Sequence, residues 1–387
     1  MVNNLTGKSK CIIIFSGYNP RAIISFLRTL NKHKVVYAII AIENDFIYQT
    51  SYKERVLSVR KLTELRLDDI IRTIREVQIK IKCDEYIIAP TSEALNRFLL
   101  ENRNHFEKLN CTIPLVQQEL YNQISNKQSF GELCRSYSIK TPEEIEPNEK
   151  RVMPYVAKPR KYRSEKDMSV LYPVIIYNQD DYNKFIKCYD EEDFYFQKYI
   201  EGRSFYLLYY FHRNGHIYKY SQENLIQQPE GKSIVAAVSS DLHDSTEALK
   251  YEKLFKSINF HGLVMVEVRG VDNDFYMIEA NPRFWGPSQL FVDAGMNLFE
   301  AFLNDYDVLE KINLQARKKE TKYFWFGGYL SVLYKNDSLV YYNYCPTQLA
   351  FDLISWISSD IYRREDTIEL FKNETRFNKV KEIKIEQ

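Results

Sequence analysis

The amino-acid sequence predicts a mixed fold, which is α/β in its first third and α+β in the region that follows. In the first third, short apolar runs alternate with helical segments, an order typical of a parallel sheet with helices on both faces. After residue 126 several strands follow one another as hairpins. With 387 residues, of which 45% are hydrophobic and 27% charged, the chain can bury a sizeable core in two or three domains.

The first third begins with an apolar run at residues 11–15, which predicts a buried strand. The turn Ser16-Gly17-Tyr18-Asn19-Pro20 follows, and apolar residues at helical spacing then predict a helix that begins at Pro20. Further elements are predicted as a strand at 35–42, a helix at 70–81 and a strand at 86–89. Gly17 lies between a strand and a helix, a common place to bind an anion, but no G-x-G-x-x-G is present and plain fold architecture is favoured.

The second region begins with a helix from Asn126-Lys127 to Tyr137, which Ser125 or Asn126 is expected to cap. Strands are predicted at 155–158, 170–176, 195–199, 205–211 and 217–221, and helices at 180–189 and 245–257. A tail from about residue 311 carries the basic stretch Arg317-Lys318-Lys319, a strand-like segment at 323–334 and a helix at 347–358. The aromatic residues 323–326 are interpreted as core, as a cover over an active site or as a homodimer face, with core packing favoured.

Charge and cysteine usage exclude several classes of protein. Lys+Arg is 53 and Asp+Glu is 52, so there is no electrostatic case for a nucleic-acid or anionic-membrane partner. The six cysteines are spread out without a C-x-x-C, which argues against a disulfide framework or a zinc site. Residues 1–10 are polar, unlike a signal peptide, and no apolar run approaches the ~18 residues of a membrane span. We therefore expect a soluble, cytoplasmic protein.

The most informative segment is residues 263–286, LVMVEVRGVDNDFYMIEANPRFWG. Two alternating runs around a turn predict an antiparallel hairpin, with Glu279 and Asn281 on one face. Glu267 lies near Glu279 if the pairing centres on the turn, although the register is not readable from the sequence. Two carboxylates and an amide oxygen suit Mg²⁺ together with phosphate oxygens, and Arg283 would reach an anion held by the metal. A solvated face with scattered acids is an equally weighted alternative for the residues alone.

Glu267, Glu279, Asn281 and Arg283 form the pattern E-x11-E-x-N-P-R, which resembles the metal and phosphate site of the ATP-grasp superfamily. The string IEANPRFWG is most similar to its carbamoyl-phosphate-synthetase-like branch of ligases. The resemblance implies that Glu267, Glu279 and Asn281 are metal ligands and that Arg283 is catalytic.

Other segments resemble the same superfamily in the same order, over roughly residues 10 to 305. Lys158 in Val156-Ala157-Lys158-Pro159 and Lys127 resemble its phosphate-contacting lysines, and Lys158 is also expected to be catalytic. The hinge that would hold the adenine is formed by Gln197, Lys198, Tyr199, Ile200 and Glu201, followed by Gly202. Residues 222–233 resemble a substrate-side loop. Each of these segments alone could have a purely structural role, and the resemblance depends on all of them occurring in the same order.

The resemblance implies a Rossmann-like domain at 1–120, an ATP-grasp domain of two lobes at 121–310 and a C-terminal extension at 311–387. Three positions depart from the superfamily pattern. Residues 159–166 are basic where relatives have a Gly-rich loop, so Arg160, Lys161 or Arg163 would have to replace its backbone donors. Ser204 stands where relatives often carry a ribose-binding acid, and Lys232 follows Gly231 where many relatives have a second glycine.

The implied function is an ATP-dependent ligase that uses Mg²⁺, or Mn²⁺ in its place. It would phosphorylate a carboxylate and join the acyl phosphate to an amine, with an amino acid or a peptide as the expected substrate. Two alternatives stay open: an ATP-dependent ligase with a thiol or bicarbonate acceptor, and a nucleotide-binding module without turnover. A homodimer is a further expectation that the sequence leaves open.

Overall fold

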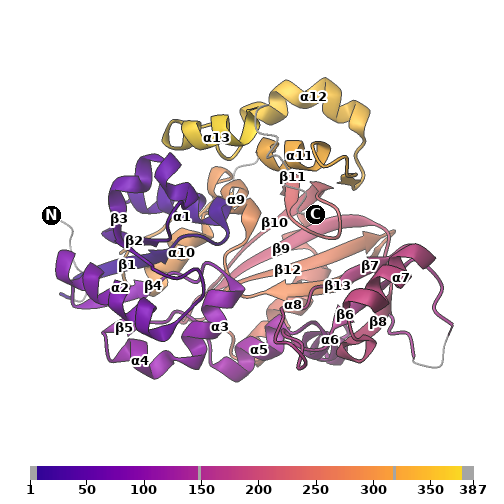
Figure 1. The fold of residues 1–387 in the computed structure, drawn as a ribbon, viewed down its shortest axis with the longest axis horizontal. Coiled ribbons are helices and arrows are strands. Elements are labelled where there is room, and N and C mark those ends of the chain that lie inside the picture. The colour runs from indigo at the N-terminus through magenta and orange to yellow at the C-terminus, as the bar shows by residue number, and fades with distance from the viewer. Residues whose placement is uncertain (1–6, 147–149, 317–319, 377–387) are drawn as a thin grey trace, which may run out of the picture.

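A computed structural model describes residues 7–146, 150–316 and 320–376, and the predicted basic stretch Arg317-Lys318-Lys319 lies outside them. The described chain forms one parallel and two antiparallel sheets, as the predicted mixed class requires. Figure 1 shows the parallel sheet at the N-terminal end, the largest sheet in the middle and the smallest at the far end. No helix in these ranges is long and apolar enough to cross a bilayer.

The parallel sheet has the strand order β3-β2-β1-β4-β5. Its strands are β1 (Lys10–Phe15), β2 (Tyr37–Ala41), β3 (Val56–Val59), β4 (Glu85–Ile88) and β5 (Cys111–Thr112). The helices of this part are α1 (Pro20–Lys32), α2 (Leu67–Lys80), α3 (Glu93–Glu101), α4 (Arg103–Glu107) and α5 (Gln118–Ser125). Along β1, Ile12 and Ile14 pack into the core that contains α1, whereas Cys11 and Ile13 pack into the core that contains α2. Both faces of the sheet are therefore covered, which explains the continuous apolar runs.

A small lobe, defined here as residues 150–198, follows the helix α6 (Lys127–Ser136). Its sheet has the order β7-β6-β8, formed by β6 (Tyr155–Pro159), β7 (Val174–Ile176) and β8 (Phe194–Lys198), with the helix α7 (Gln179–Cys188) packed on it. The lobe has its own small core of aromatic residues, including Tyr155, Phe185 and Phe196. Asn126 caps α6, since its side chain accepts hydrogen bonds from the backbone N–H groups of Gln128 and Ser129.

The large antiparallel sheet has the order β13-β12-β9-β10-β11-β14, and β15 also pairs with β10. Its strands are β9 (Arg203–Phe211), β10 (Ile217–Gln227), β11 (Ile234–Ser240), β12 (Gly262–Val271), β13 (Asp274–Asn281), β14 (Lys322–Phe324) and β15 (Val340–Tyr341). The helices α8 (Thr246–Ser257), α9 (Gln289–Asp293) and α10 (Leu298–Asp305) complete this part. The substrate-side loop expected at 222–233 is wrong in its first half, because residues 222–227 continue β10 and pair with β9 and β11.

The C-terminal segment, residues 320–376, adds β14, β15 and the helices α11 (Phe326–Leu333), α12 (Pro346–Ser358) and α13 (Ile368–Thr375). The strand expected at 323–334 is wrong beyond Phe324. Asp360 accepts the backbone N–H of Phe326 at 2.6 Å and satisfies the first turn of α11, a contact between distant parts of the chain. Tyr323 and Phe324 are buried, as the favoured core packing predicts, whereas Trp325 and Phe326 are half-buried.

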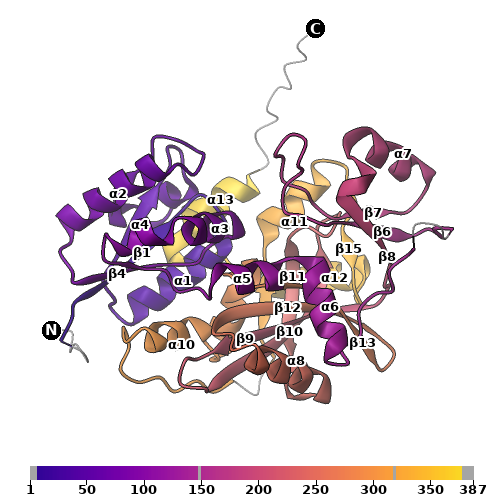
Figure 2. The same cartoon turned by 90° about the horizontal axis from the view of Figure 1, so that it is seen from below.

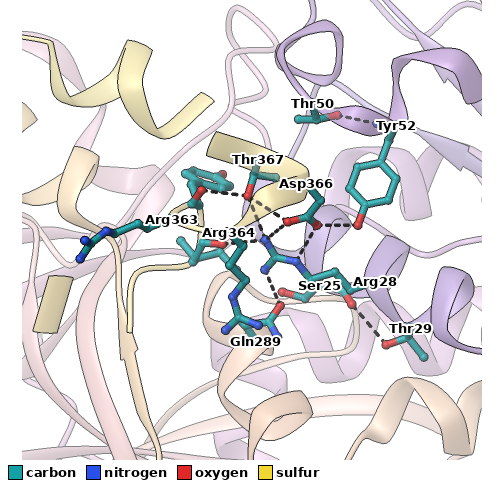
Figure 3. A network of polar contacts seen from close by, with 12 residues as sticks. Ser25, Arg28, Thr29, Thr50, Tyr52, Gln289, Arg363, Arg364, Asp366 and Thr367 are labelled. Atoms are coloured by element: carbon teal, nitrogen blue, oxygen red, sulfur yellow. Dashed lines mark hydrogen bonds and ion pairs between the residues drawn. The ribbon is translucent and has the colours of Figure 1, made fainter. Parts of the chain in front are cut away.

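A partly buried polar network around Arg28 joins the C-terminal segment to α1 (Figure 3). The Arg28 guanidinium binds both carboxylate oxygens of Asp366, at 2.8 and 2.9 Å, and donates to Gln289 of α9 at 2.8 Å. Tyr52 donates to the same carboxylate at 2.6 Å. The contacts of Arg28 thus join α1, α9 and the C-terminal segment, which are far apart in the sequence, so the C-terminal segment is an integral part of the fold.

Candidate active site

The acidic hairpin, β12 and β13, carries its two glutamates directly opposite each other. The register pairs Glu267 with Glu279 and Met265 with Asn281, and a bulge separates Glu267 from Val268. The structure therefore supplies the register that the sequence left open and brings the carboxylates to one face of the sheet. Such a pair repels unless positive charge lies between or beside the two groups.

Each carboxylate has a cationic partner. Lys127 at the start of α6 lies with its Nζ 2.8 Å from Oε2 of Glu279, and Arg269 lies with its Nη2 3.0 Å from Oε1 of Glu267. Figure 2 shows α6 beside β13, and this packing brings its first residue to the hairpin. Asn281 donates its amide N–H to Oε1 of Glu279 at 2.7 Å.

Lys158 and Arg283 complete the cluster. Lys158, on β6 of the small lobe, is 5% exposed, and its Nζ donates to the carbonyl of Ile278 at 3.0 Å. Arg283 donates to the side-chain oxygen of Asn281 at 3.3 Å. The structure thus brings together the six predicted metal and phosphate residues, Lys127, Lys158, Glu267, Glu279, Asn281 and Arg283.

The pKa values of this cluster follow from burial and from the alternating charges. Burial alone would raise the pKa of Glu279, but the ammonium of Lys127 and the Asn281 amide lower it to about 2. Burial raises the pKa of Glu267, and the nearby Glu279 carboxylate adds to the effect against the pull of Arg269. Burial and the neighbouring Lys127 lower the pKa of Lys158 to about 8. Glu279 therefore stays ionised at neutral pH, and Lys158 is a more acidic ammonium than an ordinary lysine.

The residues of the hairpin fit a magnesium ion that is shared with phosphate groups. Two carboxylates and one amide oxygen supply hard oxygen donors, and Mg²⁺ in proteins often keeps only one or two carboxylates beside phosphate oxygens and waters. Within residues 7–146, 150–316 and 320–376, no group of three or more His, Cys, Asp and Glu side chains is arranged to hold a metal by itself. The donor set is thus too small for a closed protein cage and right for a metal that arrives with a nucleotide.

Solved structures with the same architecture include the N5-carboxyaminoimidazole synthetase of Staphylococcus aureus, with a TM-score of 0.60 and 16% identity over 84% of this chain and 85% of that one. The biotin carboxylase of Campylobacter jejuni, in a complex with β,γ-ATP, matches with a TM-score of 0.58 and 12% identity over 81% and 75%. The Rhizobium etli pyruvate carboxylase matches with a TM-score of 0.58 and 17% identity, and the aligned part spans 28% of its length. No family model matches the sequence, and no curated protein matches it.

The chain has the ATP-grasp fold. At these identities the likeness shows the fold, so the roles of individual side chains rest on the geometry above.

The ATP-grasp hinge predicted at residues 197–202 leads from β8 to β9. Gln197 is 4% exposed, and its side-chain oxygen is buried without a hydrogen-bond partner among the described residues. The backbone N–H of Lys198 donates to the carbonyl of Glu143 at 2.9 Å, so any backbone contact of Lys198 with adenine is limited to its carbonyl. Tyr199 lies against Tyr177, with ring centroids 5.9 Å apart. The adenine-binding roles of Gln197, Lys198, Tyr199, Ile200 and Glu201 stay predictions.

Gly202 holds this hinge against β12. A Cβ atom at Gly202 would lie 2.3 Å from the backbone oxygen of Gly270, a distance that no side chain tolerates without a backbone shift. The glycine is thus required by the close approach of two backbones.

Two side chains of the site were missed by sequence reasoning. Arg269, which holds Glu267, also donates to the hydroxyl of Tyr342 at 2.9 Å and lies over its ring at 4.2 Å. Tyr342, which directly follows β15, in turn donates to Gln227 of β10 at 2.6 Å. Period-two spacing would have placed Arg269 on the face of Glu267, whereas no sequence signal indicates Tyr342, which arrives from the C-terminal segment.

The basic residues after Lys158 do not point to the cluster in this structure. Arg160 donates to the carbonyl of Phe194 and, at 3.5 Å, to the side chain of Gln128 on α6. Lys161 pairs with Glu165 and Arg163 donates to the carbonyl of Met168, both within the small lobe. The expectation that they replace a Gly-rich loop therefore gains no support here. Ser204 is fully buried and accepts a hydrogen bond from Asn224 at 3.0 Å, and Trp285 is a 2% exposed core residue.

Proposed function

We propose that this chain is an ATP- and Mg²⁺-dependent ligase that phosphorylates a carboxylate and joins the acyl phosphate to an amine. The proposal rests on one observation, that carboxylates and cationic side chains alternate in a single cluster at the acidic hairpin. Two facing carboxylates and Asn281 lie beside Lys127, Lys158 and Arg283, which come from two other elements and from the exit of the hairpin. A metal nucleotide is the common ligand that combines a divalent cation with several phosphate oxygens.

Glu267, Glu279 and Asn281 would hold the metal, which, when bound, offsets charge on the β- and γ-phosphates; Mn²⁺ would meet the same donors. The substrate carboxylate oxygen attacks the γ-phosphorus, the bond from that phosphorus to the β-bridging oxygen breaks, and ADP leaves. Lys127, Lys158 and Arg283 stabilise the charge that spreads over the phosphoryl oxygens. The amine nitrogen then attacks the acyl carbon, phosphate departs with its oxygen, and the proton of the amine passes to solvent.

The chemistry needs positioning more than a protein nucleophile. The proposal includes the carbamoyl-phosphate-synthetase-like branch because the string IEANPRFWG of this chain resembles that branch. Amino acids or short peptides are the proposed substrates, and a homodimer stays a prediction.

A second candidate is an ATP-dependent ligase with a bicarbonate acceptor. The structural neighbours favour it, since one solved biotin carboxylase domain of similar fold is a complex with MgADP and bicarbonate. The mass of the product separates the two, because carboxylation adds carbon dioxide to one substrate whereas amide formation joins two substrates with loss of water.

The test is ADP release from the full chain with Mg²⁺ and ATP, screened over pairs of carboxylates and amines, with mass analysis of the products. Release that requires both members of a pair supports the amide ligase, and release that requires bicarbonate supports the second candidate. Glu279→Gln should abolish the release, whereas Glu369→Gln, at a 59% exposed carboxylate on α13, should leave it unchanged. Tight ATP binding without release across the whole screen would favour a module without turnover.

A further inference from the structure

The turn between β1 and α1, Gly17-Tyr18-Asn19-Pro20, has no part in the proposed reaction, although it lies where α/β folds often bind an anion. Asn19 occupies the cap position of α1 with φ 56° and ψ 55°, in the left-handed region. A cap asparagine usually accepts a backbone N–H of its own helix. Among the described residues the Asn19 side chain makes no such bond, so its amide can serve other contacts.

The side-chain amide of Asn19 donates to two backbone carbonyls from different parts of the chain. One is the carbonyl of Phe284 at 2.9 Å, just beyond the acidic hairpin, and the other is that of Thr91 at 3.2 Å, between β4 and α3. A side-chain amide carries two N–H donors, so it can satisfy both oxygens at once. Asn19 therefore joins the carboxyl end of the first sheet to the exit of the hairpin.

The carbonyl of Phe284 is also an acceptor for Arg283, the residue proposed above to contact phosphate. Arg283 donates from Nη1 to this oxygen at 3.0 Å and from Nη2 to the side-chain oxygen of Asn281 at 3.3 Å. The guanidinium is thus held at two points. One of them is a carbonyl oxygen that Asn19 binds at the same time.

The backbone on either side of Arg283 is fastened to the same edge of the first sheet. The N–H of Phe284 donates to the carbonyl of Pro90 at 3.1 Å. Asn96 of α3, which is fully buried, donates to the carbonyl of Pro282 at 3.5 Å. β1 and β4 are neighbours in this sheet, so the connections that follow two adjacent strands grip the exit of the hairpin together.

We infer that Asn19 is a positioning residue of the proposed active site, which fixes the direction of the Arg283 guanidinium from the first sheet. The inference rests on the proposed function, in which Arg283 contacts the phosphates of the nucleotide. Without the amide of Asn19, the carbonyl of Phe284 loses one tie to the first sheet, and the guanidinium can turn with it. A charge-assisted hydrogen bond to phosphate depends on distance and angle, so such a turn weakens it. The turn between β1 and α1 then acts on phosphate through Arg283 and binds no anion itself.

The experiment is a double-mutant cycle on the binding of MgATP to the full chain, measured by isothermal titration. Asn19→Gly removes the amide, and glycine adopts a φ of 56° without strain, so the variant should fold. We expect Asn19→Gly to bind MgATP about threefold to tenfold more weakly than wild type, and Arg283→Ala about tenfold more weakly or worse. The double variant should bind no more weakly than Arg283→Ala, because Asn19 acts through that side chain.

The matched control is Asn110→Gly, at an exposed asparagine between α4 and β5 with φ 55°, which should leave the affinity unchanged. Thermal unfolding of each variant verifies that it is folded. Wild-type affinity of Asn19→Gly, whatever its unfolding temperature, would show a purely structural contact and overturn the inference. A double variant that binds more than about twofold more weakly than Arg283→Ala would also overturn it, because the two residues would then act independently.

The same titrations separate this inference from the proposed function. If MgATP does not bind the wild-type chain, the proposed function fails and the role of Asn19 falls with it. If MgATP binds and the cycle shows no coupling between Asn19 and Arg283, only the role of Asn19 is refuted and the proposed function stands.

Discussion

Replacing Glu279 by Gln tests whether the ion pair with Lys127 stabilises the acidic hairpin in the absence of metal. The substitution keeps the shape of the side chain and removes its charge. Lys127 then loses the carboxylate that lies 2.8 Å from its Nζ, and it stays beside Lys158, whose positive charge repels it. The variant should therefore be less stable than wild type in metal-free buffer at neutral pH.

The magnitude follows from the pKa of Glu279, which the folded protein lowers from 4.5 to about 2. At about 1.4 kcal/mol per pKa unit, this shift corresponds to about 3 kcal/mol of unfolding free energy at pH 7. Because the pKa in the folded state is depressed, the contribution is complete above pH 4.5 and is lost as the pH falls towards 2. At pH 3 it should have fallen to roughly 1 kcal/mol.

The assay is urea unfolding of wild type and Glu279→Gln, followed by tryptophan fluorescence without metal at pH 7 and pH 3. The control is Glu369→Gln, which breaks an exposed ion pair with Lys372 on α13 and should leave the free energy of unfolding nearly unchanged. A Glu279→Gln difference below about 1 kcal/mol at pH 7, or one that does not shrink in acid, would refute the reasoning from linkage. The site would then not be preformed by the Lys127 pair.

Three other outcomes are expected. Tyr342→Phe removes the hydroxyl that accepts a hydrogen bond from Arg269 at 2.9 Å. In a metal titration, the Mg²⁺ concentration needed for half-maximal ADP release should rise about threefold to tenfold, with kcat little changed. An equal fall in kcat alone would contradict a positioning role for Tyr342. Gly202→Ala places a methyl group against the carbonyl of Gly270 and should destabilise the protein by about 1–3 kcal/mol in thermal unfolding, so a neutral result would disprove the close approach. In the folded protein, Lys158, with a pKa of about 8, should react with a small amine-directed reagent at pH 8 faster than ordinary lysines, and ATP with Mg²⁺ should protect it. Labelling that first appears near pH 10 would show an unperturbed amine.

Local patterns explain why much of the architecture was predicted correctly. The strand at 11–15 and the helix from Pro20 are each specified by a run of apolar residues with a clear period and a turn between them. The helix beginning at Lys127 is specified by the Asn126 cap, which the structure confirms. The segment at 323–334 was predicted wrongly because its aromatic residues suit a strand, while a remote carboxylate, that of Asp360, begins a helix at Phe326.

In the candidate site, too, local sequence patterns predicted some features and long-range contacts decided others. The sequence alone determined that Glu267, Glu279 and Asn281 lie on one hairpin with Arg283 just beyond it, because a two-residue period and a turn are local properties of the chain.

Only the tertiary structure decided which charges face one another. It paired Glu279 with Lys127 and brought Tyr342 to Arg269. These contacts join residues far apart in the sequence, and their energies depend on burial and distance, which no local pattern of residues records.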